Sequence, residues 1–123
     1  MKHIIRRHTI SFKNAYAGIK WAFSSQPNYT VHVLLSLLAI VGGLLFNISY
    51  NEWLTILTFI ILGLTIETIN TAIESATDCI DTHTREDIKI AKDVAAGAML
   101  IFAIGSVVVA VIIFVPKLLL IIS

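Results

Sequence analysis

Three long apolar runs dominate the chain, and polar segments separate them. Residues 29–48 and 94–115 contain no Asp, Glu, Lys or Arg, and residues 53–66 form a third uncharged run. About 20 apolar residues are enough for a helix to cross the roughly 30 Å hydrocarbon core of a membrane. The pattern therefore predicts three transmembrane helices, over about residues 29–48, 50–80 and 86–115.

A shorter amphipathic pattern precedes the first run. Four apolar residues recur there at helical spacing: Phe12, Tyr16, Ile19 and Phe23. They predict a surface helix over about residues 9–24 that lies in the headgroup plane of a membrane. Packing of the same apolar side on a helical bundle is an open alternative. Residues 1–10 carry basic residues but no apolar period, so we expect a basic arm there.

Local signals mark where these helices begin and end. Pro27 is best tolerated in a new first turn and predicts a break between the surface helix and the first span. Ser49 and Glu52 have the spacing of a capping box, so the second span should begin directly after Ser49. Pro116 predicts the end of the third span, and Lys117 predicts an anchor at the membrane surface.

Composition agrees with a membrane protein. Hydrophobic residues make up 57% and charged residues 14% of the 123 residues, which is too apolar for a soluble domain of this size. The one cysteine, Cys79, cannot form an intrachain disulfide. No secretory signal is expected, because the first long apolar run has no small-residue cleavage site after it. We predict one all-α integral membrane domain over residues 1–123, without a nucleic-acid partner.

The basic residues are distributed unevenly about the predicted spans. Every Lys and Arg except Lys117 lies before the first span or after the second, and the connection over residues 47–52 has none. Basic residues favour the cytoplasmic side of a membrane. The N-terminus and the polar segment over residues 78–93 are therefore expected in the cytoplasm, and the C-terminus outside.

The polar end of the second span carries the candidate chemistry. Five residues there are three or four positions apart and share one helix face: Glu67, Asn70, Glu74, Asp78 and Asp81. A charged residue inside a membrane costs roughly 2.5–3.5 kcal/mol at mid-depth, so it usually marks a pathway, a pairing or a reaction site. If Trp53 lies at one interface, Glu67 lies roughly 9 Å below the other, with Glu74 at it.

The two glutamates suit a division of labour. They stand about 10.5 Å apart along the helix axis, too far for a directly paired acid and base. One glutamate could bind a Mg²⁺ ion that also binds phosphate oxygens, while the other takes a proton from the attacking nucleophile. Phosphoryl transfer needs little more from a protein than these two functions and the positioning of the reactants. Other interpretations stay open: a polar seam between subunits satisfied by Asn70, Thr71 or Lys92, a non-catalytic membrane subunit, or a cation pathway.

Two further features of the sequence bear on the fold and on the assembly. The chain has neither the Walker A motif nor the Gly-rich and H-R-D motifs of protein kinases, which excludes a soluble kinase fold. Three spans also enclose buried carboxylates poorly, since lipid would touch most faces of each helix. We therefore expect a homo-oligomer.

Two segments resemble the signature blocks of the prokaryotic diacylglycerol kinase family. Residues 67–78, E-T-I-N-T-A-I-E-S-A-T-D, resemble its E-x-x-N-[ST]-A-I-E-x-x-x-D motif, and residues 91–98, A-K-D-V-A-A-G-A, resemble its second block. The separation matches without a gap, and the resemblance covers nearly the whole chain. It implies a homotrimer in the bacterial cytoplasmic (inner) membrane, with sites shared between subunits. It also implies direct, Mg-ATP-dependent phosphorylation of a lipid hydroxyl.

The resemblance implies roles for individual residues. Glu67 is the expected general base, Glu74 the expected Mg²⁺ ligand, and Asn70 the residue that orients the site. Nucleotide contacts are implied for Arg7, Asn14, Gln26, Glu74, His83, Thr84, Arg85, Lys92 and Asp93. Lipid contacts are implied for Glu67, Asn70, Trp53 and Ala96.

Gln26 departs from the family pattern. The best-known members have a second metal-binding glutamate at this position, and a neutral amide is a poorer Mg²⁺ ligand than a carboxylate. The Q-P-N-x-x-x-H segment over residues 26–32 and the I-I-F-V-P-K segment over residues 112–117 resemble the undecaprenol kinase branch more than the diacylglycerol branch. The residues give no physical argument for one lipid tail over the other, so diacylglycerol and undecaprenol both stay open.

Overall fold

The structure, a computed structural model, describes residues 2–80, 83 and 85–123, with side chains described from residue 11 onward. Within this part the chain forms four helices: α1 (Lys2–Ser25), α2 (Pro27–Leu45), α3 (Tyr50–Ile80) and α4 (Glu86–Ile122). The last three are long and apolar enough to cross a membrane. The prediction of an all-α fold with three candidate membrane spans is therefore confirmed, and it is consistent with an integral membrane protein.

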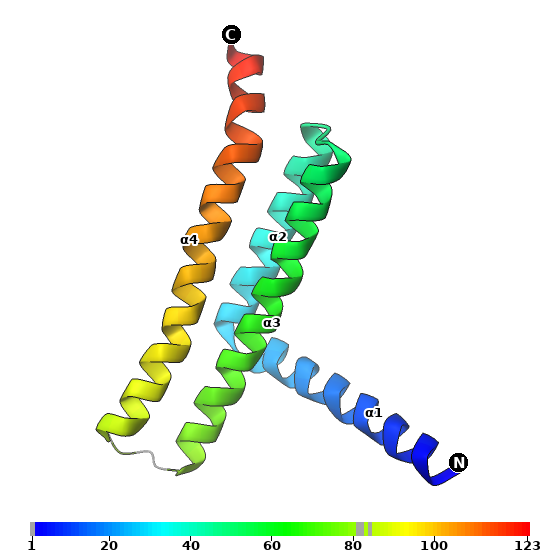
Figure 1. The fold of residues 1–123 in the computed structure, drawn as a ribbon, viewed down its shortest axis with the longest axis vertical. Helices are drawn as coiled ribbons and strands as arrows, with labels where there is room; N and C mark the ends of the chain where they lie inside the picture. The colour runs from blue at the N-terminus through cyan, green and yellow to red at the C-terminus, as the bar shows by residue number, and fades with distance from the viewer. Residues whose placement is uncertain (1, 81–82, 84) are drawn as a thin grey trace.

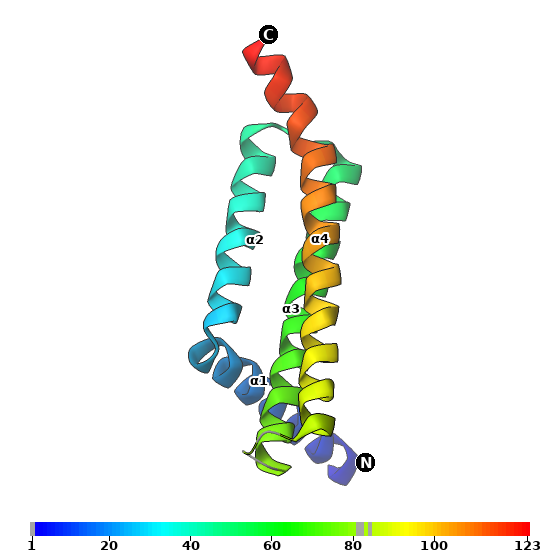
Figure 2. The same cartoon turned by 90° about the vertical axis from the view of Figure 1, so that its left-hand side faces the viewer.

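α3 is the central helix of the bundle. α2 and α4 both pack along it, and the α3–α4 contact is the more extensive. The N-terminus and the α3–α4 connection lie toward one end of the molecule, whereas the α2–α3 connection and the C-terminus lie at the other (Figure 1 and Figure 2). The polar end of α3 and the polar start of α4 are consequently side by side.

α1 leaves the bundle at a steep angle (Figure 1). Only its C-terminal part packs on α2 and α3: Ala22 is buried there, and the Phe23 and Tyr29 rings meet edge to face at a centroid distance of 6.0 Å. α1 begins at Lys2, so the predicted start of the helix near residue 9 is wrong. The segment before residue 9 holds neither Gly nor Pro, so a helix formed after it can extend through it without an apolar period of its own.

The α2–α3 connection is tight because both helix ends are capped. Asn47 adopts a left-handed φ of 48°, which asparagine tolerates better than most residues. The Ile48 N–H then donates to the Gly43 carbonyl and the Asn47 N–H to the Leu44 carbonyl, which is a Schellman motif. The predicted capping box follows it: Ser49 N–H donates to Glu52 Oε2 at 2.7 Å, and Glu52 N–H donates to Ser49 Oγ at 3.3 Å.

A small apolar core lies next to this connection. Ile48, Ile56 and Ile113 are buried together, and Trp53 packs against them. Gly43 of α2 makes that packing possible, because a Cβ there would come within 2.7 Å of the Trp53 ring and 2.9 Å of the Ile48 side chain. α2 can thus approach the indole only where it has no side chain.

The Gly43→Ala substitution should destabilise the bundle by about 1–3 kcal/mol, the usual cost of adding a methyl group to a packed site. Denaturant titration of the protein in detergent measures this change. Gly18→Ala is the matched control, since a Cβ at Gly18 meets nothing within 4 Å. It should be neutral or gain up to about 1 kcal/mol from helix propensity. Equal effects of the two substitutions would contradict the packing described for Gly43.

α4 continues to Ile122 with Pro116 inside it, so the prediction that Pro116 ends the third span is wrong. Proline removes one backbone hydrogen bond, and membrane helices tolerate this loss when neighbouring groups compensate. The red end of α4 leans away from the line of its yellow part (Figure 2). Lys117 Nζ donates to Glu52 Oε1 at 2.6 Å and ties this end of α4 to the first turn of α3.

Candidate functional site

A groove of about 380 Å³ lies between α2, α3 and α4, toward the end of the bundle that holds the α3–α4 connection. Its α3 wall consists of Glu67, Asn70 and Glu74. The other walls come from α2 and α4: Asn28, Val31, His32, Ala96, Met99, Leu100 and Ala103. The first three positions of the predicted stripe and Ala96 are therefore together in one groove.

Glu67 is buried within a membrane-spanning helix. Only 3% of the residue is exposed, and its Oε2 lies 3.7 Å from His32 Nε2 on α2. α3 is continuous from Tyr50 to Ile80, so the stripe keeps its helical register from Glu67 to Asp78. The carboxylate therefore faces the groove at the helix interface.

Asn70 and Glu74 are coupled to each other one turn further along. Asn70 Nδ2 donates to Glu74 Oε1 at 3.4 Å, a long hydrogen bond. Asn70 is buried, whereas Glu74 is half-buried. Among the side chains that the structure describes, Asn70 Oδ1 and the neighbouring Thr71 Oγ1 are buried without a hydrogen-bond partner. The amide of Asn70 thus contacts the Glu74 carboxylate and still offers an unused acceptor in the groove.

Asp78, the last position of the stripe within the described residues, pairs with α4. Lys92 Nζ donates to Asp78 Oδ1 at 2.5 Å, which links the end of α3 to the second turn of α4. Asp93 accepts a hydrogen bond from Lys89 one turn earlier on α4. Lys92 therefore lies beyond the groove, at the polar end of the bundle, where it faces the acidic stripe.

The other predicted nucleotide residues lie on separate elements. Asn14 is exposed on α1, and Gln26 is the half-buried N-cap of α2. Arg85 holds Asp87 through two hydrogen bonds of 3.2 and 2.7 Å, and His83 is exposed. Arg7 belongs to α1 with its side chain outside the described part, and Thr84 and Asp81 lie outside the described residues altogether. Within this single chain the structure does not gather these residues around the groove.

Trp53 is also far from the groove. It is 14 residues before Glu67 on the same helix, which is about 21 Å along the axis. Its ring packs against Gly43 and Ile48. The single chain therefore separates Trp53 from the other three predicted lipid contacts by most of the thickness of a membrane.

Sequence reasoning missed most of the residues from α2 and α4 that line the groove. His32 is among them, and it is the closest basic group to Glu67 in the described part of the chain. One signal was available: Asn28 and His32 are four positions apart and so share one helix face. Which face points toward Glu67 depends on how α2 packs on α3, and the pattern of α2 alone does not contain that information.

An apolar cavity of about 230 Å³ continues from the groove toward the α2–α3 connection. His32 and Ala103 line both spaces. The remaining lining is almost entirely aliphatic or aromatic, and it includes Phe59, Phe102 and Phe114. A polar groove and an apolar cavity therefore meet at His32.

Comparisons with known proteins agree with the resemblance of the two sequence blocks. The profile of the family described as prokaryotic diacylglycerol kinase matches residues 13–114. The chain is 34% identical over 116 residues to the undecaprenol kinase of Bacillus subtilis, and the match covers 93% of both proteins. It is 34% identical over 111 residues to the diacylglycerol kinase of Synechocystis sp., covering 89% of this chain and 63% of that protein. The chain therefore belongs to the prokaryotic diacylglycerol kinase family, and it is a lipid kinase.

Proposed function

We propose that this lipid kinase transfers the γ-phosphate of Mg-ATP to the hydroxyl of diacylglycerol or undecaprenol at the cytoplasmic face of the membrane. The observation that carries this proposal is the groove in which Glu67, Asn70 and Glu74 lie together. The hydroxyl oxygen bonds to the γ-phosphorus, the bond to the β-phosphate oxygen breaks and ADP leaves, and Glu67 takes the hydroxyl proton. A buried carboxylate beside an apolar cavity suits a lipid alcohol better than a water-soluble one.

The residues of the groove fit a magnesium ion shared with the nucleotide. Mg²⁺ prefers hard oxygen ligands, and it is usually held by one or two carboxylates together with phosphate oxygens and water. Glu74 supplies a half-buried carboxylate, and the unpartnered Oδ1 of Asn70 lies beside it. We propose Glu74 as the main metal ligand. When bound, the ion neutralises charge on the transferring phosphate.

Gln26 is the proposed second metal contact, by its position in the family pattern. If its neutral amide is the weaker ligand, Gln26→Glu should lower the Mg²⁺ concentration that gives half-maximal activity, because a carboxylate binds the ion more strongly. A magnesium titration at fixed ATP measures this. Gln26→Ala serves as the control and should raise the concentration. No response to either substitution would remove Gln26 from the metal site.

The nucleotide is proposed to bind at the polar end of the bundle. Lys92, Arg85 and Asp93 are ion-paired there and at least partly exposed, so phosphate oxygens could replace the carboxylates that the two cations now contact. Asn14, His83, Thr84 and Arg7 complete the proposed set. These residues are spread over several elements, which supports a site completed by a neighbouring subunit of a homotrimer. The mass of the detergent-solubilised protein by light scattering tests the trimer.

The side chains of α1 support a surface helix. Phe12, Tyr16 and Ile19, on the predicted apolar face, are exposed to between 51% and 78%, which is unfavourable in water and favourable in the headgroup region. We propose that α1 lies in the cytoplasmic headgroup plane of the bacterial inner membrane, with the N-terminus inside and the C-terminus outside.

The single cysteine offers a test of this orientation. Cys79 is exposed at the end of α3, on the proposed cytoplasmic side. A membrane-impermeant maleimide should label it in inverted vesicles and leave it unlabelled in right-side-out vesicles. The combined substitution Cys79→Ser and Ser123→Cys is the control and should reverse the result. Labelling of Cys79 from the outside would contradict the proposed topology.

One experiment tests the proposed reaction and the choice of lipid. The purified protein in bilayer mimics receives Mg-ATP with labelled γ-phosphate and, in separate samples, diacylglycerol, undecaprenol or ceramide. Labelled diacylglycerol or undecaprenol supports the proposal, and the faster of the two acceptors identifies the better substrate. Absence of label from both lipids, or preference for ceramide, would contradict it.

A further inference from the structure

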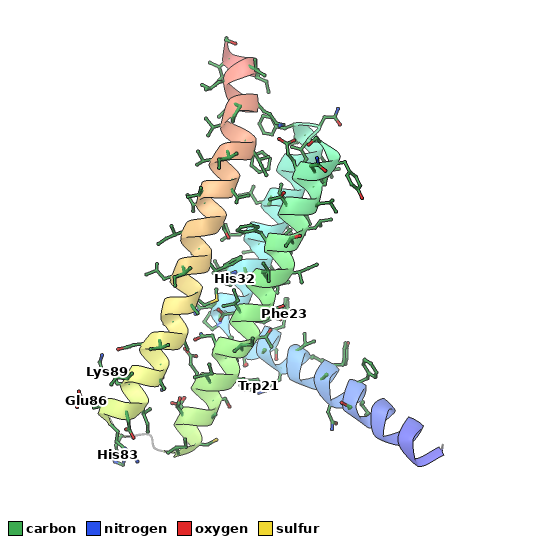
Figure 3. All side chains as sticks on the ribbon, viewed as in Figure 1. Trp21, Phe23, His32, His83, Glu86 and Lys89 are labelled. Atoms are coloured by element: carbon green, nitrogen blue, oxygen red, sulfur yellow. The ribbon has the colours of Figure 1, made fainter. Side chains whose placement is uncertain are left out.

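His32 of α2 lies between Glu67 of α3 and Phe102 of α4, so it contacts both of the other spans. It belongs to α2, and its Nε2 is 3.7 Å from Glu67 Oε2 on α3. On α4, the Phe102 ring centroid is 6.3 Å from that of the imidazole, with the two planes tilted by 48°. Figure 3 shows His32 inside the bundle, away from the polar end where His83, Glu86 and Lys89 lie. The imidazole therefore lies between the carboxylate and an aromatic ring.

The charges around Glu67 give His32 a specific importance. The Glu67 side chain is 4% exposed. A carboxylate removed from water needs a partner that donates a hydrogen bond to it or carries a positive charge. Glu74, the other ionisable group on α3 in this groove, has the same sign of charge. From α4 the groove receives only Ala96, Met99, Leu100 and Ala103. Within the described residues, His32 is the basic group on these walls that lies within 4 Å of the Glu67 carboxylate.

Packing holds the imidazole against Glu67. The Phe102 ring lies so close to α3 that a Cβ on Gly63 would come within 2.7 Å of it. Phe59 covers the same ring, at a centroid distance of 5.8 Å. The Phe102 ring therefore packs over Gly63, which is one turn from Glu67 on α3. In this position it limits where the His32 ring can move.

We propose that His32 is a positioning residue for the Glu67 base, an inference that rests on the proposed function. The imidazole holds Oε2 of the carboxylate and leaves Oε1 free to take the proton of the lipid hydroxyl. A separation of 3.7 Å is too long for a direct hydrogen bond. Contacts of this kind are often long in ligand-free enzymes and shorten when the substrate binds.

The first test compares the kcat of two substitutions of His32. If the side chain only fills space, His32→Leu should be the more active of the two. If it positions Glu67, His32→Gln should be the more active. His32→Leu keeps an apolar side chain against the cavity but removes the donor, and it should lower kcat roughly 10- to 100-fold with the KM for Mg-ATP unchanged. His32→Gln keeps an N–H donor near the position of Nε2 and should restore most of kcat. Ser36→Ala, one turn further along α2 and lining the same cavity, is the control and should retain wild-type kcat.

The second test does not depend on activity. In protein labelled with ¹⁵N at histidine and reconstituted in bicelles, Glu67→Gln should shift the ring-nitrogen resonance of His32. Glu74→Gln should leave it in place. The His32→Gln spectrum identifies the resonance. No shift with Glu67→Gln would overturn the contact.

The two tests separate this inference from the proposed function. A wild-type protein that phosphorylates lipid, with His32→Leu more active than His32→Gln, would overturn only the role of His32. A wild-type protein that phosphorylates no lipid would overturn the proposed function, and the positioning role with it. An active wild type, Gln ranked above Leu, and the ¹⁵N shift together would establish the role.

Discussion

Glu67→Gln should reduce lipid phosphorylation roughly 10²- to 10⁴-fold, the usual contribution of a general base. Glutamine has nearly the same shape and still faces His32, but it cannot accept the hydroxyl proton. Binding of Mg-ATP should change little, because Glu74 and the polar end of the bundle are unaltered. Single-turnover transfer of labelled phosphate to lipid, measured beside ATP binding, separates the two effects.

The control for this substitution is Glu52→Gln. Glu52 is a carboxylate on the same helix but lies at the opposite end of α3, in the capping box and paired with Lys117. Its neutralisation should weaken the bundle and leave kcat of the folded protein near the wild-type value. Full activity of Glu67→Gln in bilayer mimics would remove Glu67 as the base. It would favour a non-catalytic role for the stripe, or a cation pathway that shows ion flux without ATP.

Glu74→Gln should raise the Mg²⁺ concentration needed for half-maximal activity roughly 10- to 100-fold, a loss of about 1.4–2.8 kcal/mol of binding free energy. Glutamine is the informative substitution because its Oε1 can still accept the hydrogen bond from Asn70. The charge of the ligand is therefore what changes. A magnesium titration at saturating lipid gives the shift, and the KM for lipid should stay as it is.

Glu74→Asp provides the comparison for this prediction. It keeps the charge but shortens the side chain, so its effect on Mg²⁺ dependence should lie between those of wild type and Glu74→Gln. An unchanged magnesium dependence in Glu74→Gln would show that the ion is held elsewhere. The proposed division of labour between Glu67 and Glu74 would then fall, while Glu67 could still act as the base.

Much of the fold follows from local signals that the structure leaves unchanged. The three uncharged runs became three helices long enough to span a membrane. Pro27 stands in the first turn of α2, and the Ser49–Glu52 capping box begins α3 as predicted. Such signals act over one or two turns of chain, so they hold wherever the helices pack.

The two wrong predictions about the fold concern where helices begin and end. α1 begins before its amphipathic period, and α4 passes through Pro116. An apolar period indicates which side of a helix is buried, but it does not indicate where the helix begins or ends. Proline likewise costs a hydrogen bond whose weight depends on the groups around it, and here the Lys117–Glu52 ion pair holds the segment after it.

The sequence by itself determined the spans, the family and the acidic face of α3, because hydrophobic length and helical periodicity are written in the order of residues. Only the tertiary structure decided what that face meets. α2 brings His32 to Glu67, and α4 brings Lys92 to Asp78. Both contacts depend on the rotation of one helix against another, which is set by packing such as Phe102 over Gly63 and which no single helix encodes.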